Sequence, residues 1–147
     1  MTEINTASAA ISFARKLEED SAMFYESLAQ RYPENRDTFL LNARENIKFI
    51  TQFEMVYYSV ISDALEGGFG FKINPEEYAV KTEPTKGVSY TRALRETIEM
   101  EDRIIKFYSD AAEQSRSLLA DVPRTFMQIA RKITERKRIL ESFLSKD

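Results

Sequence analysis

The stretch "KLEEDSAMFYESLAQ", residues 16–30, has a counterpart later in the chain. Residues 99–113 read "EMEDRIIKFYSDAAE", and the two stretches align at an offset of 83 positions. The matched residues are Glu18 and Glu101, Phe24 and Phe107, Tyr25 and Tyr108, and Ala29 and Ala112. A chain that repeats such a pattern is expected to repeat a unit of structure.

Both stretches have the spacing of one helical face, with steps of three and four residues. The first stripe is Ile11, Ala14, Glu18, Ala22, Tyr25 and Ala29. The second is Leu94, Thr97, Glu101, Ile105, Tyr108 and Ala112. Each stripe is mostly apolar and has one carboxylate near its middle. We expect helices over about residues 6–31 and 90–117.

A second repeat follows each of these helices. "DTFLLNAR" (37–44) resembles "RTFMQIAR" (124–131) at an offset of 87. These segments open two further predicted helices, over about residues 34–66 and 122–145. Pro33 and Pro123 suit first helical turns, and Gly67 and Gly68 suit the end of the second helix. Their inward stripes are predicted to include Phe39, Asn42, Asn46, Phe49 and Phe53, and Phe126, Ile129, Ile133, Arg136 and Leu140.

The lengths of the connections predict how the four helices are joined. Two short connections make the first and second helices one hairpin, and the third and fourth another. Residues 67–89 are long enough to cross from one end of a bundle to the other. We therefore expect an all-α, single-domain four-helix bundle over residues 1–147, two hairpins joined by a long crossover. The alternative is an up-down bundle with a floppy loop.

Composition limits the chemistry. The 147 residues include no cysteine and no histidine, and the formal net charge is −3. Disulfides, thiolate sites, serine triads and H-E-x-x-H zinc sites are excluded. Acids and bases are interspersed, so no nucleic-acid surface is expected. No apolar run approaches the roughly 20 residues that cross a bilayer, and no signal peptide is seen at the N-terminus. We expect a cytoplasmic protein without membrane contact.

The repeated unit resembles the rubrerythrin branch of the ferritin-like superfamily. The resemblance is carried by "LEEDSAMFY" (17–25), by "MEDRIIKFY" (100–108) and by the crossover, and it covers nearly the whole chain. It implies a ferritin-like fold with a di-iron site inside the bundle. In that site the first and third helices each give a Glu, and the second and fourth each give Glu-x-x-His. Such iron pairs react with oxygen or peroxide.

The family's ligand positions are only partly filled in this chain. Glu18 and Glu101 match the glutamates of the first and third helices. In the family an alanine stands three residues before the Glu of Glu-x-x-His. Counting from Ala43 and from Ala130, the remaining positions fall on Asn46, Phe49, Ile133 and Arg136. A register shifted by one residue gives Glu45-x-x-Lys48 and Lys132-x-x-Glu135, which restores two carboxylates and no imidazole.

We therefore expect a charge cluster formed by Glu18, Glu101, Arg136 and Asn46. A buried carboxylate needs a partner, and the arginine is a permanent cation able to neutralise both glutamates. The alternatives are that the glutamates reach water at the edge of their stripes and that Arg136 snorkels along a helix flank.

Three functions compete. The leading hypothesis is a rubrerythrin-related bundle that has lost its di-iron site, has no cofactor or catalytic residue, and acts as a structural or partner-binding protein. It would be a homodimer, with an unknown protein partner, and Tyr57, Tyr58, Phe69 and Phe71 are candidates for an exposed dimer surface. The second hypothesis is an oxidoreductase or peroxidase that holds iron or manganese through carboxylates alone. The third is a small-molecule binder that uses the bundle core.

Overall fold

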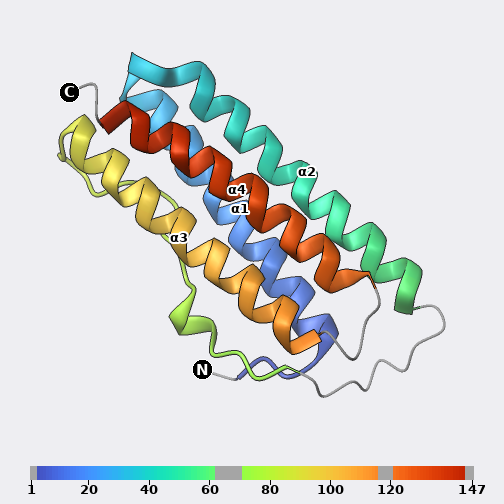
Figure 1. The fold of residues 1–147 in the computed structure, drawn as a ribbon. Helices are drawn as coiled ribbons and strands as arrows, with labels where there is room; N and C mark the ends of the chain where they lie inside the picture. The colour runs from blue at the N-terminus through green and yellow to red at the C-terminus, as the bar shows by residue number, and fades with distance from the viewer. Residues whose placement is uncertain (1–2, 62–70, 116–120, 145–147) are drawn as a thin grey trace.

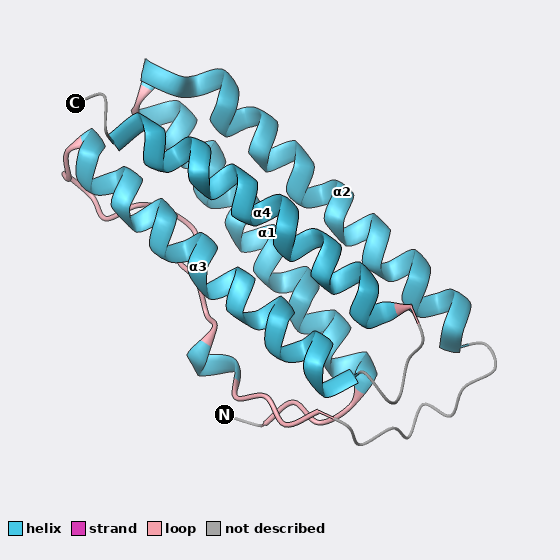
Figure 2. Ribbon diagram, in the orientation of Figure 1, coloured by secondary structure: helices cyan, strands magenta, loops and turns pink. Residues whose placement is uncertain are grey.

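The protein is a four-helix bundle in the computed structural model, which describes residues 3–61, 71–115 and 121–144 (Figure 1). The long helices are α1 (Ala7–Arg31), α2 (Arg36–Ile61), α3 (Tyr90–Ser115) and α4 (Val122–Leu144). Two short 3₁₀ turns, η1 (Pro33–Asn35) and η2 (Pro75–Glu77), lie between them. The described residues contain no strand (Figure 2), so the all-α prediction is confirmed. None of their helices has the length and apolarity that a membrane span requires.

The helices form two antiparallel hairpins. α1 packs mainly on α2, and α3 packs mainly on α4. The described part of the crossover, residues 71–89, runs along the bundle to the end where α3 begins, so α2 and α3 point the same way (Figure 1). This is the course that the length of the connection predicted. The last residues of the expected second helix, with Gly67 and Gly68, lie outside the described residues.

Side chains before the helices fix where two of them begin. The Thr6 hydroxyl accepts a hydrogen bond from the Ala9 amide at 3.1 Å and caps α1. The Ser89 hydroxyl accepts a hydrogen bond from the Arg92 amide at 3.1 Å. It thereby satisfies one of the first amides of α3, which have no acceptor within the helix. Pro33 opens the 3₁₀ turn rather than α2 itself, and Pro123 is the second residue of α4. Proline suits these positions because their amides have no helical acceptor.

The predicted stripes form the core. Every residue of the first stripe is buried, and in the second stripe only Ile105 is partly exposed. Aromatic side chains fill one level of the core, where the ring centroid of Phe126 lies 6.3 Å from Phe53 and 5.4 Å from Tyr108. At another level Tyr25 stacks on Phe39 at 6.3 Å.

Two of the four aromatic residues expected on the surface are buried in the described part of the chain. Tyr57 and Phe71 are only 5% and 4% exposed, so their prediction as exposed dimer contacts is wrong. Phe71 is buried because the chain next to it is held against the N-terminus, where Ile4 and Ile73 exchange backbone hydrogen bonds of 2.7 and 3.0 Å. Tyr58 is exposed as expected, and Phe69 lies outside the described residues.

Candidate functional site: a charge cluster in the bundle core

Each of the four helices places one polar residue of the predicted cluster at the centre of the bundle. These residues are Glu18 on α1, Asn46 on α2, Glu101 on α3 and Arg136 on α4. The first three are fully buried, and Arg136 is 6% exposed. Because all four sit on stripes that are mostly apolar, the packing of the helices buries them. The two alternatives that left Glu18, Glu101 and Arg136 at the water interface do not hold.

Arg136 is the central hydrogen-bond donor of the cluster. Its Nη2 and Nε donate to Oε2 of Glu101 at 2.6 and 3.0 Å, which makes a buried ion pair. Its Nη1 donates to Oδ1 of Asn46 at 2.7 Å and to Oε1 of Glu45 at 3.2 Å. The Asn46 amide in turn donates to the Ser21 hydroxyl at 2.9 Å. The guanidinium also lies over the rings of Tyr25 and Phe49, 5.3 and 5.4 Å from their centroids. Such charge-assisted contacts offset the cost of burying the cation.

Glu18 departs from the expected pairing. Among the described residues it forms no ion pair with Arg136, whose buried pairing is to Glu101. Burial raises the pKa of Glu18 to about 8, although the nearby Arg136 charge and a hydrogen bond from Tyr108 partly oppose the rise. Glu18 is therefore mostly protonated at neutral pH. The expectation that Glu18 and Glu101 both keep their charge is corrected for Glu18, because Arg136 directs its donors to the other carboxylate.

Two tyrosines form hydrogen bonds between the two halves of the repeat. The Tyr25 hydroxyl on α1 donates to Oε2 of Glu101 on α3 at 2.6 Å. The Tyr108 hydroxyl on α3 donates to Oε2 of Glu18 on α1 at 2.5 Å. Burial, followed by the neighbouring carboxyl group, raises the pKa of both tyrosines well above the ordinary value, so both remain donors. The repeated spacing of an acid seven residues before a tyrosine thus serves a reciprocal pair of hydrogen bonds.

Three buried polar atoms have no hydrogen-bond partner among the described residues. They are Oε1 of Glu18, Oε1 of Glu101 and Nδ2 of Asn42. Both carboxyl groups therefore use a single oxygen, and the Glu101 oxygen that Arg136 contacts also accepts from Tyr25. The ion pair is consequently not the two-oxygen fork that arginine can form with a carboxylate.

The side chains at the family's ligand positions do not suit a di-iron centre. Phe49 and Ile133 are buried hydrocarbon without a donor atom. Arg136 brings a permanent positive charge to the centre of the bundle, where it donates to Oε2 of Glu101 and would repel a metal cation. Hard carboxylate oxygens and imidazole are the donors that such iron pairs use, and here one of the two family-position glutamates is tied to arginine.

The shifted register does not supply the missing ligands. Lys48, Lys132 and Glu135 are exposed and lie off the inward stripes of α2 and α4. Glu45 is about one third exposed, and its carboxylate contacts Arg136. A carboxylate-only metal site at these positions would need the exposed Glu135 side chain to turn into the core.

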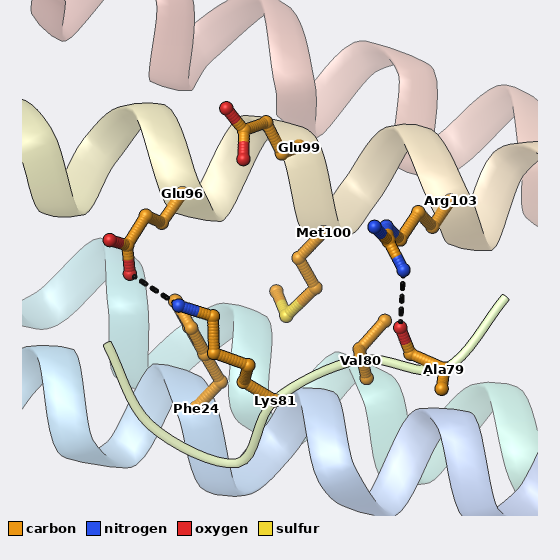
Figure 3. A pocket seen from close by; sticks show the side chains of 8 residues that line it. All are labelled: Phe24, Ala79, Val80, Lys81, Glu96, Glu99, Met100 and Arg103. Atoms are coloured by element: carbon orange, nitrogen blue, oxygen red, sulfur yellow. Dashed lines mark hydrogen bonds and ion pairs between the residues drawn. The ribbon is translucent and has the colours of Figure 1, made fainter. Parts of the chain in front are cut away.

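A separate small pocket lies between the crossover and α3, not in the bundle core (Figure 3). Its volume is about 120 Å³, and Phe24, Val80 and Met100 supply its apolar walls. Lys81 pairs with Glu96 at 3.2 Å, and Arg103 donates to the Ala79 carbonyl at 3.0 Å, as Figure 3 shows. These polar contacts hold the crossover against α3, so the pocket is a small gap where these two segments pack together.

Sequence reasoning found the four members of the cluster but missed its supporting contacts. The stripes marked Glu18, Glu101, Asn46 and Arg136 as inward, because each stands at a three- or four-residue step from apolar neighbours. Ser21 and the hydrogen bonds of the two tyrosines were not assigned. The sequence does contain a signal for these two hydrogen bonds. A buried tyrosine hydroxyl needs an acceptor, and each stripe carries a carboxylate two helical turns before its tyrosine.

Comparisons with protein-family models, with curated proteins and with solved structures find no match to this chain. The resemblance to the rubrerythrin branch therefore depends on the repeated stretches of residues 17–25 and 100–108.

Proposed function

We propose that this chain is a rubrerythrin-related, ferritin-like bundle in which a guanidinium group has taken the place of the metal cations. In this proposal the core is a structural centre and not a reactive one. The protein serves as a structural or partner-binding bundle and forms a homodimer.

The ion pair between Arg136 and Glu101 carries the proposal. Four helices converge on it, as they would on a metal, and its single cation is covalently part of the chain. Arg136 donates to groups from α2 and α3 at 2.6 to 3.3 Å, so it joins both hairpins. A cation that is part of the chain and pairs with Glu101 removes the need for a bound ion to neutralise that carboxylate.

Charge is the physical reason to expect poor metal binding. A divalent cation entering beside Glu101 would meet Arg136 in a medium of low dielectric, where repulsion between like charges is strong. Glu18 would also have to lose the proton that its raised pKa retains at neutral pH. Both effects oppose binding, and the oxidoreductase alternative depends on that binding.

Thermal unfolding with and without metal tests the proposal. A site with a micromolar dissociation constant would stabilise the fold by about 2.7 kcal/mol at roughly 100 μM metal, a hundredfold excess over that constant. We expect the melting temperature of the native chain to stay unchanged with ferrous or manganous ion. A melting temperature that climbs with either metal would contradict the proposal.

The converse experiment restores the family's ligands. The variant with Asn46→Glu, Phe49→His, Ile133→Glu and Arg136→His carries two Glu-x-x-His pairs at the level of Glu18 and Glu101. Circular dichroism establishes that this variant folds, and we then expect its melting temperature to rise with ferrous ion. A folded variant whose melting temperature does not change with ferrous ion would show that the lost site was assigned to the wrong residues. A variant with Arg136→His alone is the matched control, because it lacks the two introduced carboxylates and the second histidine, and we expect its melting temperature to stay unchanged with ferrous ion.

A further inference from the structure

Three arginines form a line along the outer side of α4. Arg124, Arg131 and Arg138 are seven residues apart, and all three are exposed. Seven residues make nearly two turns of an α-helix, so the three side chains share one stripe and recur about every 10.5 Å along the axis. The buried residues of α4 lie on the opposite face of the helix. We call these three residues the arginine ridge.

The charge of the arginine ridge is not neutralised within the chain. Four exposed cations on α1 and α3 pair with an acid four residues further along the same helix. Within the described part of the chain, Arg131 and Arg138 enter no ion pair, and Arg124 approaches only Asp121, at 3.8 Å. Glu135 lies between Arg131 and Arg138 in the sequence, but it pairs with neither. The ridge therefore keeps a net positive charge on a chain that is acidic as a whole.

A shallow hollow lies beside the first arginine of the ridge, between α3 and α4. Ala112 on α3 and Pro123, Arg124 and Met127 on α4 are among the residues that line it. Ala112 is buried and small, whereas the Met127 side chain is 38% exposed. An apolar side chain can enter this hollow while an acidic neighbour reaches the arginine at its edge, which gives an apolar contact with a charged rim.

The spacing of the ridge indicates which kind of molecule fits it. A helix that lies along α4 presents the same face every seven residues, so acids at that interval would each meet one arginine. A nucleic acid fits less well. Its phosphates recur about every 3.4 Å along each strand, so some of them would face Glu135. It also has no apolar side chain for the hollow.

We propose that the arginine ridge and the hollow beside it dock a helix of another protein, with an acidic residue at every seventh position and an apolar residue next to the first acid. This inference rests on the proposed role of the chain as a partner-binding bundle, and it names the chemistry of the partner. The occupant is another protein because this sequence nowhere carries three acidic residues at intervals of seven.

Fluorescence anisotropy with labelled synthetic peptides tests the proposal on the full chain. The first peptide is a helix of three heptads with one glutamate at the same position of each heptad and a leucine one turn from the first glutamate. The second has the same composition, but its glutamates are moved off the seven-residue interval. We expect the first peptide to bind at least about tenfold more tightly, and its affinity to fall as salt screens the charges. Equal binding of the two peptides, or tighter binding of a short DNA duplex, would overturn the proposal.

Neutralising the ridge should weaken binding of the first peptide. Arg131→Gln and Arg138→Gln together should raise the dissociation constant by at least about fivefold, because each exposed ion pair contributes only a modest amount. Arg44→Gln is the matched control, since Arg44 is exposed on α2 and enters no ion pair in the described part of the chain. Glu135→Gln should instead tighten binding, because it removes the acid between two arginines. Equal effects of the ridge and control variants would contradict the assignment.

The hollow is tested by placing a charge in it. Met127→Glu should weaken binding of the first peptide, because the leucine would then meet a carboxylate. Met23→Glu on α1, where the side chain is 52% exposed, is the control and should leave binding unchanged. A native chain that binds neither peptide, and whose melting temperature does not change with metal, would refute the ridge alone and leave the proposed metal-free core standing.

Discussion

Glu18 and Glu101 occupy equivalent positions of the repeat and yet differ in their bonding partners. Glu101 is tied to Arg136 at 2.6 Å, whereas Glu18 accepts only the Tyr108 hydroxyl. The difference arises on α4, where one half of the repeat carries an arginine and the other half, on α2, carries Phe49 at the matching position. The two halves of the repeat therefore place different side chains beside the two acids.

Glu18→Gln should change how stability depends on pH. Burial raises the pKa of Glu18 from about 4.5 in the unfolded chain to about 8 in the folded one. Between these values the unfolded chain releases the proton and the folded chain keeps it, so this residue lowers the free energy of unfolding as pH rises. The slope approaches about 1.4 kcal/mol per pH unit. Urea unfolding at pH 5 to 9 should find the variant near the native stability at pH 5, increasingly more stable up to about pH 8, and more stable by a constant amount above that.

Glu101→Gln is the matched comparison at the equivalent position. It should destabilise the fold throughout the same pH range, because Arg136 loses the carboxylate that neutralises it. Equal behaviour of the two variants, or a large loss in Glu18→Gln without a pH trend, would show that the two acids are not distinct.

At the scale of elements, the crossover is held to α3 by specific contacts. Glu96 is buried, and its carboxylate accepts from the Thr85 amide at 2.9 Å and from Lys81 at 3.2 Å. The Tyr78 hydroxyl donates to Asp110 at 2.6 Å. Before α3 the chain turns at Gly87, whose φ of 79° is the left-handed conformation that glycine adopts without strain. These contacts lock the returning chain along the bundle.

Glu96→Gln should loosen the crossover in a pH-dependent way. Burial opposes ionisation of Glu96, but hydrogen bonds from Thr85 and the Lys81 ion pair outweigh it and lower the pKa to about 2. The carboxylate therefore stabilises the fold above about pH 4.5, and that contribution is lost as pH falls toward 2. At pH 7 we expect a loss of about 1–2 kcal/mol and faster hydrogen exchange of the Thr85 amide. Glu99→Gln, an exposed neighbour on α3, should change neither quantity.

Periodicity predicted the elements better than it predicted the site. The steps of three and four residues placed all four helices and their inward faces, because a stripe is a property of the backbone period. The same pattern put Arg136 inside the bundle beside Glu101. It could not determine which of two symmetric acids the guanidinium would contact, since that depends on a few ångströms of helix packing. Nor did it show that Tyr57 and Phe71 are covered, because their burial depends on how the crossover and the N-terminus lie.

At the scale of the whole molecule, the buried ion pair joins the two hairpins. Arg136 extends from α4 to α3 and to α2, so breaking the pair should weaken the entire bundle and not one helix. A buried pair of this kind is costly to break on one side, at about 3–5 kcal/mol, because the remaining charge is left without a counter-charge. Replacing both partners by neutral groups costs much less.

The most direct test is a double-mutant cycle on this pair, measured as the free energy of unfolding in urea. Its variants are Arg136→Met, Glu101→Gln and the two together; the glutamine still offers an oxygen to Tyr25. If Arg136 is the cation that completes the core, each single change costs about 3–5 kcal/mol, and the double change costs clearly less than their sum. Single losses that add to within about 0.5 kcal/mol would show that the two side chains act independently, and would contradict the central role of the pair.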